Sequence, residues 1–119
     1  AAANKVDNII STIDYNGQQI DGSTENVLSL GNLHAKLESF GWTVLEEKNG
    51  NDLEAVIAIL ELAKTETGKG KPVVIILHTE MGAGVDFMMG THAWHGKAPN
   101  DEQLDTAFKQ LYLEAPADY

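Results

Sequence analysis

The spacing of apolar residues changes along the chain, and these changes predict where strands and helices lie. Runs rich in β-branched residues predict short strands over residues 8–14, 42–46 and 73–77. Between them, apolar residues recur at intervals of three and four, which predicts helices over residues 24–40 and 52–67. The chain therefore alternates strand and helix, a pattern typical of an α/β fold.

The third strand is the most informative of these elements. Residues 73–77 are apolar in succession, too few for an ordinary helix and mostly β-branched, which indicates a strand buried on both faces of a parallel sheet. Residues 81–100 then show no period, so we expect a long loop, and residues 101–113 predict a last helix. We expect an open, mostly parallel α/β sheet with helices on both faces. Three strands are few for such a sheet, so we expect part of a domain.

Capping residues set the expected helix ends. Asn51, with Glu54 three residues later, predicts a capping box at the start of the second helix. Asn100 or Asp101 is expected to begin the last helix.

Composition narrows the possible functions. The chain has 119 residues, 43% of them apolar, and no cysteine, which fits one globular domain or part of one and excludes disulfides and thiol nucleophiles. No apolar run approaches the ~20 residues that span a bilayer, and no segment resembles a signal peptide, so we expect a soluble cytoplasmic protein with no membrane contact. The net charge of −10 disfavours nucleic-acid binding but allows a small phosphorylated ligand.

Two loops follow strand ends, where ligands bind in open parallel sheets: residues 15–22 and 78–99. In the first, Asn16 precedes a glycine, and amide and carbonyl oxygens there could bind a hard cation such as Mg²⁺ or Ca²⁺. The same Asn-Gly pair is also an ordinary turn dipeptide. The spacing differs from that of an EF-hand loop.

The second loop contains His92 and His95. Imidazoles three residues apart could bind a metal, move protons or donate to a phosphate, or they could satisfy buried backbone groups of an ordered loop. His78 and Glu80 follow the buried strand and are expected to project toward the same site, whereas His34 is expected to be a surface residue on a helix.

Three segments, in this order, resemble the thiamine-diphosphate-binding domain of transketolases, above all the form whose N-terminal part is a separate subunit. Residues 13–22 are similar to the family's Asp-x-Asn-Gly-x-x-Ile-Asp-Gly segment, and residues 40–46 to its Phe/Leu-Gly-Trp strand. The Gly-x-Gly at residues 82–84 and residues 90–99 resemble its Gly-Thr-His-x-x-His-Gly-x-Pro loop.

The resemblance implies a role for four of these residues. Asn16 would bind Mg²⁺ (or Ca²⁺) through its side-chain oxygen, and Gln18 through its backbone carbonyl. Asn16 and Ile20 would also contact the cofactor, thiamine diphosphate, and His95 would face its diphosphate and the sugar as a cofactor-binding and catalytic residue. No definite role follows for His92.

The resemblance also implies a reaction and its partners. The reaction is transfer of a two-carbon ketol unit from a ketose phosphate to an aldose phosphate. The expected partners are these sugar phosphates and a C-terminal, pyrimidine-binding subunit or domain of transketolase, in a homo- or hetero-oligomer whose sites lie between subunits.

The family's Gly-Asp-Gly segment and its pyrimidine-binding domain are not among these residues. We therefore expect residues 1–119 to be the later part of a thiamine-diphosphate-binding domain, inactive by itself. Alternatives are a non-catalytic interaction module that keeps the fold, another thiamine enzyme such as 1-deoxyxylulose-5-phosphate synthase or dihydroxyacetone synthase, and an unrelated α/β metal-binding domain.

Overall fold

A three-stranded parallel sheet forms the centre of the computed structural model, which describes residues 1–111. Its strands are β1 (Ile10–Tyr15), β4 (Thr43–Glu47) and β5 (Val73–His78), in the order β1–β5–β4. All three predicted strands are confirmed, with bounds shifted by no more than two residues. The apolar run of β5 lies in the middle of the sheet because it pairs with a strand on each side.

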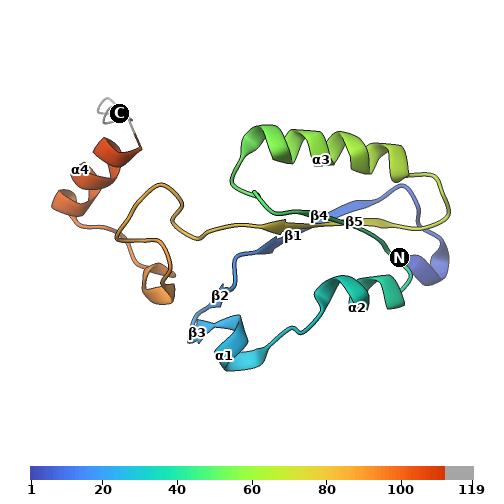
Figure 1. Ribbon diagram of the computed structural model, residues 1–119, viewed down its shortest axis with the longest axis horizontal. Coiled ribbons are helices and arrows are strands. Elements are labelled where there is room, and N and C mark those ends of the chain that lie inside the picture. The colour runs from blue at the N-terminus through green and yellow to red at the C-terminus, as the bar shows by residue number, and fades with distance from the viewer. Residues whose placement is uncertain (112–119) are drawn as a thin grey trace.

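Helices lie on both sides of this sheet, as predicted. Helix α3 (Leu53–Glu66) covers one face, and α2 (Leu33–Ser39) lies on the opposite side against β4 (Figure 1). The chain passes from β4 through α3 to β5, which is a crossover between parallel neighbours.

The core sits between α3 and the sheet. Side chains alternate between the two faces of a strand, so every second residue of β5 faces α3. The buried residues of this cluster are Ile59, Ala63, Val73 and Ile75. Partly buried residues from α3 and all three strands pack around them: Ile10, Leu45, Leu60 and Leu77. The other face of β5 carries Val74, Ile76 and, at its end, His78.

The prediction of one helix over residues 24–40 is wrong. The structure has two helices there, α1 (Thr24–Leu28) and α2. Gly31 between them adopts a φ of 55°, and the side chain of Asn32 caps α2 by accepting a hydrogen bond from a backbone N–H. The apolar spacing continues across this break, so the spacing alone does not distinguish two short helices from one.

The predicted cap at Asn51 is also wrong. Helix α3 starts after Asp52, whose carboxylate accepts hydrogen bonds from the backbone N–H groups of Glu54 and Ala55 at 2.9 and 3.3 Å. The side chain of Asn51 instead contacts the backbone of Glu80, which follows β5. Asn51 therefore forms a long-range contact with Glu80 instead of the helix cap that the local sequence predicts.

The C-terminal part of the described chain extends away from the sheet (Figure 1). Helix α4 (Asp101–Gln110) begins after Asn100, which forms the expected capping box, whereas residues 112 and 113 of the predicted helix lie outside the described residues. The radius of gyration is 17.7 Å, against about 13–14 Å for a compact domain of this length. In residues 1–111, no helix is long and apolar enough to cross a membrane.

Truncation of the central strand should destabilise the fold. Ile75 is 0% exposed, so Ile75→Ala leaves a cavity and is expected to lower the free energy of unfolding by about 2–5 kcal/mol. Ile57→Ala, on the exposed side of α3 where the side chain is 45% exposed, should cost about 1 kcal/mol or less. Urea denaturation followed by circular dichroism measures both, and equal losses would contradict this account of the core.

Candidate functional site

The first candidate segment is a tight turn at the carboxyl end of β1. The side-chain oxygen of Asn16 accepts a hydrogen bond from the backbone N–H of Gln18 at 2.9 Å, and Gly17 between them has a φ of 69°. The backbone carbonyl of Gly17 accepts from the N–H of Thr24 at 2.9 Å. The predicted loop also contains two short antiparallel strands, β2 (Gln18–Gln19) and β3 (Gly22–Ser23). The turn and the hairpin therefore hold this segment in one shape.

The donor set of this turn suits a metal ion with an anionic ligand. The Asn16 oxygen makes one hydrogen bond and keeps a second lone pair. The side-chain nitrogen of Gln19 is buried and has no hydrogen-bond partner within residues 1–111, so a phosphate oxygen could satisfy it. Ile20 beside it is 66% exposed and leaves apolar surface open to a ligand.

The second candidate segment is the long loop after β5. It contains a short 3-10 helix, His92–Trp94, capped by Thr91. The indole N–H of Trp94 donates to the backbone carbonyl of Phe87 at 2.7 Å, and the two rings lie 5.3 Å apart. The ammonium of Lys97 lies 4.7 Å from the Trp94 ring centre. These contacts order the loop around Trp94.

His92 and His95 are both exposed on this ordered loop. Within residues 1–111 neither imidazole forms a hydrogen bond, so these side chains do not satisfy buried backbone groups. The loop and the Asn16 turn lie on the same side of the sheet, beyond the carboxyl ends of the strands (Figure 1). The described residues show no hydrogen bond that joins His95 to the turn.

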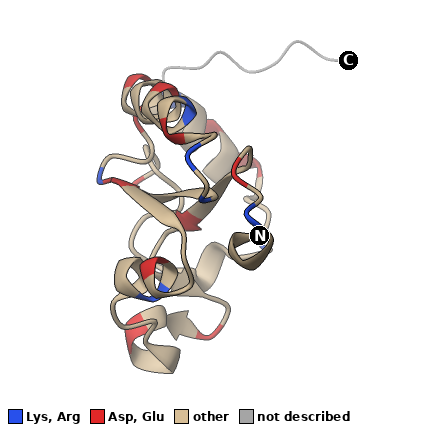
Figure 2. Cartoon of the chain, turned by 90° about the vertical axis from the view of Figure 1, so that its right-hand side faces the viewer, with Lys and Arg blue, Asp and Glu red and all other residues tan. Residues whose placement is uncertain are grey.

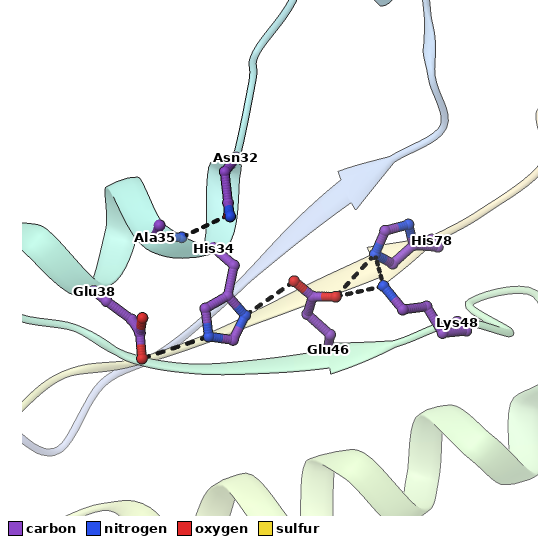
Figure 3. A network of polar contacts seen from close by, with 7 residues as sticks. All are labelled: Asn32, His34, Ala35, Glu38, Glu46, Lys48 and His78. Carbon is purple, nitrogen blue, oxygen red and sulfur yellow. Dashed lines mark hydrogen bonds and ion pairs between the residues drawn. The ribbon is translucent and has the colours of Figure 1, made fainter.

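A third group of polar residues was missed by the sequence analysis, and Figure 3 shows it. The carboxylate of Glu46 on β4 contacts His34 Nδ1 at 2.9 Å and His78 Nε2 at 3.4 Å, and it accepts a hydrogen bond from Lys48 Nζ. His34 also lies 3.5 Å from Glu38 through its other nitrogen. His34 lies on α2 with its side chain 38% exposed, so it is at the surface as expected, but its ring also contacts the sheet through Glu46.

The parallel register explains why these side chains meet. Tyr15 pairs with His78, and Glu47 pairs with Leu77, so Lys48 stands level with His78 at the end of the sheet. Residues two apart on a strand share a face, which places Glu46 beside Lys48. The sequence did show charged and polar residues at the ends of two predicted strands, at residues 46–48 and 78. Only the register of the sheet shows that these two strand ends are adjacent.

Lys48 has the largest effect on the ionisation of Glu46. The pKa of Glu46 is lowered from 4.5 to about 2, and the hydrogen bond from Lys48 is the largest cause. Partial burial opposes this shift, whereas the contact with His34, the charge of Lys48 and the contact with His78 contribute to it. The carboxylate is therefore ionised over the whole neutral range and joins α2, β4 and β5.

A hollow of about 530 Å³ lies beside this group, between residues 48–52 and residues 78–80. The backbone N–H of Gly50 donates to the carbonyl of His78 at 2.8 Å, and a Cβ on Gly50 would lie only 2.8 Å from that oxygen. His78 and Glu80 both line this hollow, as expected of residues that follow β5. Glu80 also accepts a hydrogen bond from the N–H of Gly90 at 2.7 Å, which connects it to the long loop.

No part of residues 1–111 holds three or more His, Asp or Glu side chains placed to bind a metal ion. Acidic positions occur on helices, strand ends and loops alike (Figure 2). A metal at the Asn16 turn would therefore be bound by amide and backbone oxygens, together with ligands from elsewhere.

Comparison with known proteins gives one consistent family. Residues 1–118 match the family described as the transketolase thiamine diphosphate binding domain. One of the subunits of an apulose-4-phosphate transketolase from Phocaeicola vulgatus is 37% identical over 107 residues, which are 90% of this chain and 37% of that relative. The 6-deoxy-6-sulfo-D-fructose transketolase subunit SqwG from a Clostridium species is 33% identical over 96% of this chain and 40% of its own length.

The fold agrees with this family. The crystal structure of transketolase from Campylobacter jejuni superimposes with a TM-score of 0.82 and 31% sequence identity, over 96% of this chain and 17% of that one. The predicted parallel α/β fold with helices on both faces is thereby confirmed. The chain spans 37–40% of the length of the two subunit relatives and a smaller share of the larger enzyme.

The Glu46 network should make stability depend on pH under acidic conditions. A carboxylate whose pKa is lowered on folding stabilises the native state at pH values above its pKa in the unfolded chain, here 4.5. This stabilisation is lost as the pH falls toward the folded-state pKa of about 2. Glu46→Gln should therefore be less stable than the original chain at pH 7, and this difference should shrink between about pH 5 and pH 2.

Urea denaturation at several pH values tests this expectation. Glu61→Gln is the matched control, because its ion pair with Lys64 lies on the exposed side of α3 and should contribute little. A stability difference for Glu46→Gln that stays constant from pH 7 to pH 2 would show that the carboxylate is not held by these charges.

Proposed function

The chain belongs to the family of transketolase thiamine-diphosphate-binding domains, and from this premise we propose that it supplies the diphosphate and metal side of a transketolase-type active site. The observation that carries the proposal is the fixed turn at Asn16, which presents an amide oxygen and adjacent backbone carbonyls beyond the carboxyl end of β1. This is the edge of an open parallel sheet at which ligands bind.

The proposed metal ligands are the side-chain oxygen of Asn16 and the backbone carbonyl of Gln18. Both are neutral oxygen donors, which suit Mg²⁺ or Ca²⁺. Mg²⁺ prefers about six oxygen ligands, so these two leave places for the diphosphate, for water and for the aspartate of the family's Gly-Asp-Gly segment.

The proposed cofactor contacts are Asn16, Gln19, Ile20 and His95. Thiamine diphosphate, when bound, supplies the carbanion chemistry for two-carbon transfer. The buried side-chain N–H of Gln19 would donate to a phosphate oxygen, and the exposed side chain of Ile20 would pack against the cofactor. His95 would bind the diphosphate and the sugar and move a proton during transfer.

Substrates and partners follow from the relatives. Two of them are named as subunits of transketolases, for apulose 4-phosphate and for 6-deoxy-6-sulfo-D-fructose. We propose that this chain likewise acts with a pyrimidine-binding subunit or domain, in a homo- or hetero-oligomer, on a ketose and an aldose that are phosphorylated or similarly anionic. Residues 1–119 alone would not catalyse transfer. The cytoplasmic location expected from the composition stays a prediction.

Asn16→Ala tests the metal assignment. In the complete enzyme assembled with its partner, loss of one metal oxygen is expected to weaken Mg²⁺ and thiamine diphosphate together, by about tenfold or more. Calorimetric titration of thiamine diphosphate, with and without Mg²⁺, measures the effect. Asn4→Ala, on the exposed 3-10 helix η1 (Ala2–Asn4), is the control and should bind normally. A loss of stability with unchanged cofactor affinity would mean that Asn16 is only a turn residue.

His95→Ala tests the catalytic assignment. Because the imidazole is exposed and makes no described hydrogen bond, its removal should leave the melting temperature nearly unchanged while turnover falls about 100-fold or more. His92→Ala is a matched comparison on the same loop and should affect turnover less. Steady-state kinetics and thermal denaturation separate the two effects. Normal turnover in His95→Ala would refute its catalytic role.

A further inference from the structure

We propose that His78 is a positioning residue for the cofactor and metal turn: it fixes Tyr15, and through Tyr15 it fixes the turn at Asn16. This inference rests on the proposed function, because it takes the Asn16 turn as the place where Mg²⁺ and thiamine diphosphate bind. His78 itself is not proposed to touch either ligand.

The first step is the contact between the two rings. Tyr15 is the last residue of β1 and pairs in register with His78, the last residue of β5. Residues paired in this way point to the same face of a parallel sheet. Their ring centres lie 5.2 Å apart at an angle of 86°, an edge-to-face contact that is favourable beyond the burial of the rings.

The second step is what holds the imidazole in this orientation. His78 Nε2 lies 3.0 Å from the ammonium of Lys48, which can only donate hydrogen bonds. The same nitrogen lies 3.4 Å from the carboxylate of Glu46, so Nε2 faces the Lys48–Glu46 ion pair. Lys48 is itself bound to the carboxylate of Glu46, so the ammonium that orients the ring is anchored on the neighbouring strand.

The backbone holds His78 as well. Its carbonyl accepts the N–H of Gly50 at 2.8 Å, and the turn at Gly50 approaches so closely that a Cβ there would collide with that carbonyl oxygen. Side chain and backbone of His78 are therefore both fixed by residues that follow β4. This rigidity lets His78 serve as a support for β1.

The last step leads from Tyr15 to the metal turn. The backbone carbonyl of Tyr15 accepts a hydrogen bond from the N–H of Thr79 at 3.4 Å, and its ring contacts His78. The end of β5 and the residue after it therefore hold both the backbone and the ring of Tyr15. Asn16 is the next residue, and its side-chain oxygen already bonds to the N–H of Gln18. A shift of Tyr15 would tilt the peptide that leads into this turn. Metal ligands need support of this kind to keep their geometry.

The test uses the complete enzyme assembled with its partner and titrates thiamine diphosphate in the presence of Mg²⁺. His78→Leu keeps the bulk of the side chain but removes the ring and the Lys48 bond. We expect its Kd for thiamine diphosphate to rise about 3- to 10-fold. His78→Phe restores an aromatic ring without the Lys48 bond, and we expect it to recover most of the lost affinity.

Two further variants distinguish positioning from plain stabilisation. Tyr15→Phe keeps the ring and should bind the cofactor normally, because the described residues give the Tyr15 hydroxyl no hydrogen bond. His34→Ala removes the other histidine on Glu46, which does not touch Tyr15, so it should lower the melting temperature without changing the Kd. In a double variant, His78→Leu with Tyr15→Leu, both substitutions remove the same contact between the two rings. The double variant should therefore bind thiamine diphosphate no more weakly than the weaker of the two single variants.

The outcomes separate this inference from the proposed function. If the unaltered enzyme does not bind thiamine diphosphate with Mg²⁺, the proposed function fails, and the inference fails with it. If the unaltered enzyme binds but His78→Leu binds equally well, or His78→Phe gives no recovery, the positioning role alone is refuted. Additive losses in the double variant would also refute it. Should His78→Leu not fold, Tyr15→Leu replaces it, because it removes the same ring contact. Tyr15→Leu should then bind thiamine diphosphate more weakly than His78→Phe, and equal Kd values would refute the positioning role.

Discussion

The central constraint on this fold is that the apolar run of β5 must be enclosed on all sides. Val73, Val74, Ile75 and Ile76 are at most 2% exposed, which requires a strand on each edge and cover on each face. Parallel pairing with β1 and β4 satisfies both edges. It also brings the three carboxyl ends level, so residues that are 30 or more positions apart in sequence meet in one row. The parallel pairing that buries β5 thus also brings the residues of the candidate site together.

The two faces of the sheet then take different roles. The face toward α3 carries the apolar cluster that forms the core. On the opposite face, apolar residues give way to Glu46 and His78 toward the carboxyl end, and α2 adds His34. A partly buried carboxylate is tolerated there because Lys48 and two imidazoles surround it. The polar side chains of this face therefore gather toward the carboxyl ends of the strands, where β1 leads into the Asn16 turn.

Local sequence was enough to predict the strands, the helix α3 and the overall α/β class, since each follows from apolar spacing within a few residues. It failed where a residue had two possible partners. Asn51 could cap α3, but its amide bonds to Glu80 after β5, and Asp52 caps the helix instead. Likewise, neither the acceptor for His34 nor the row of Tyr15, His78 and Lys48 could be predicted without the register of the sheet. The Asn16 turn was found because its signal lies within three consecutive residues.

The charge of the chain supports the proposal of a metal ion in this site. The chain carries a net charge of −10, and Lys48, the cation beside His78 at the end of the sheet, is already paired with Glu46. A diphosphate would therefore meet a repulsive field and no available lysine in the Asn16 turn. Neutral donors such as the Gln19 amide can orient phosphate oxygens but cannot offset their charge. A divalent cation bound by neutral oxygens can do so, because its own charge dominates the local field. For this reason binding of an anionic cofactor here should depend on the metal more steeply than in a site lined by lysine or arginine.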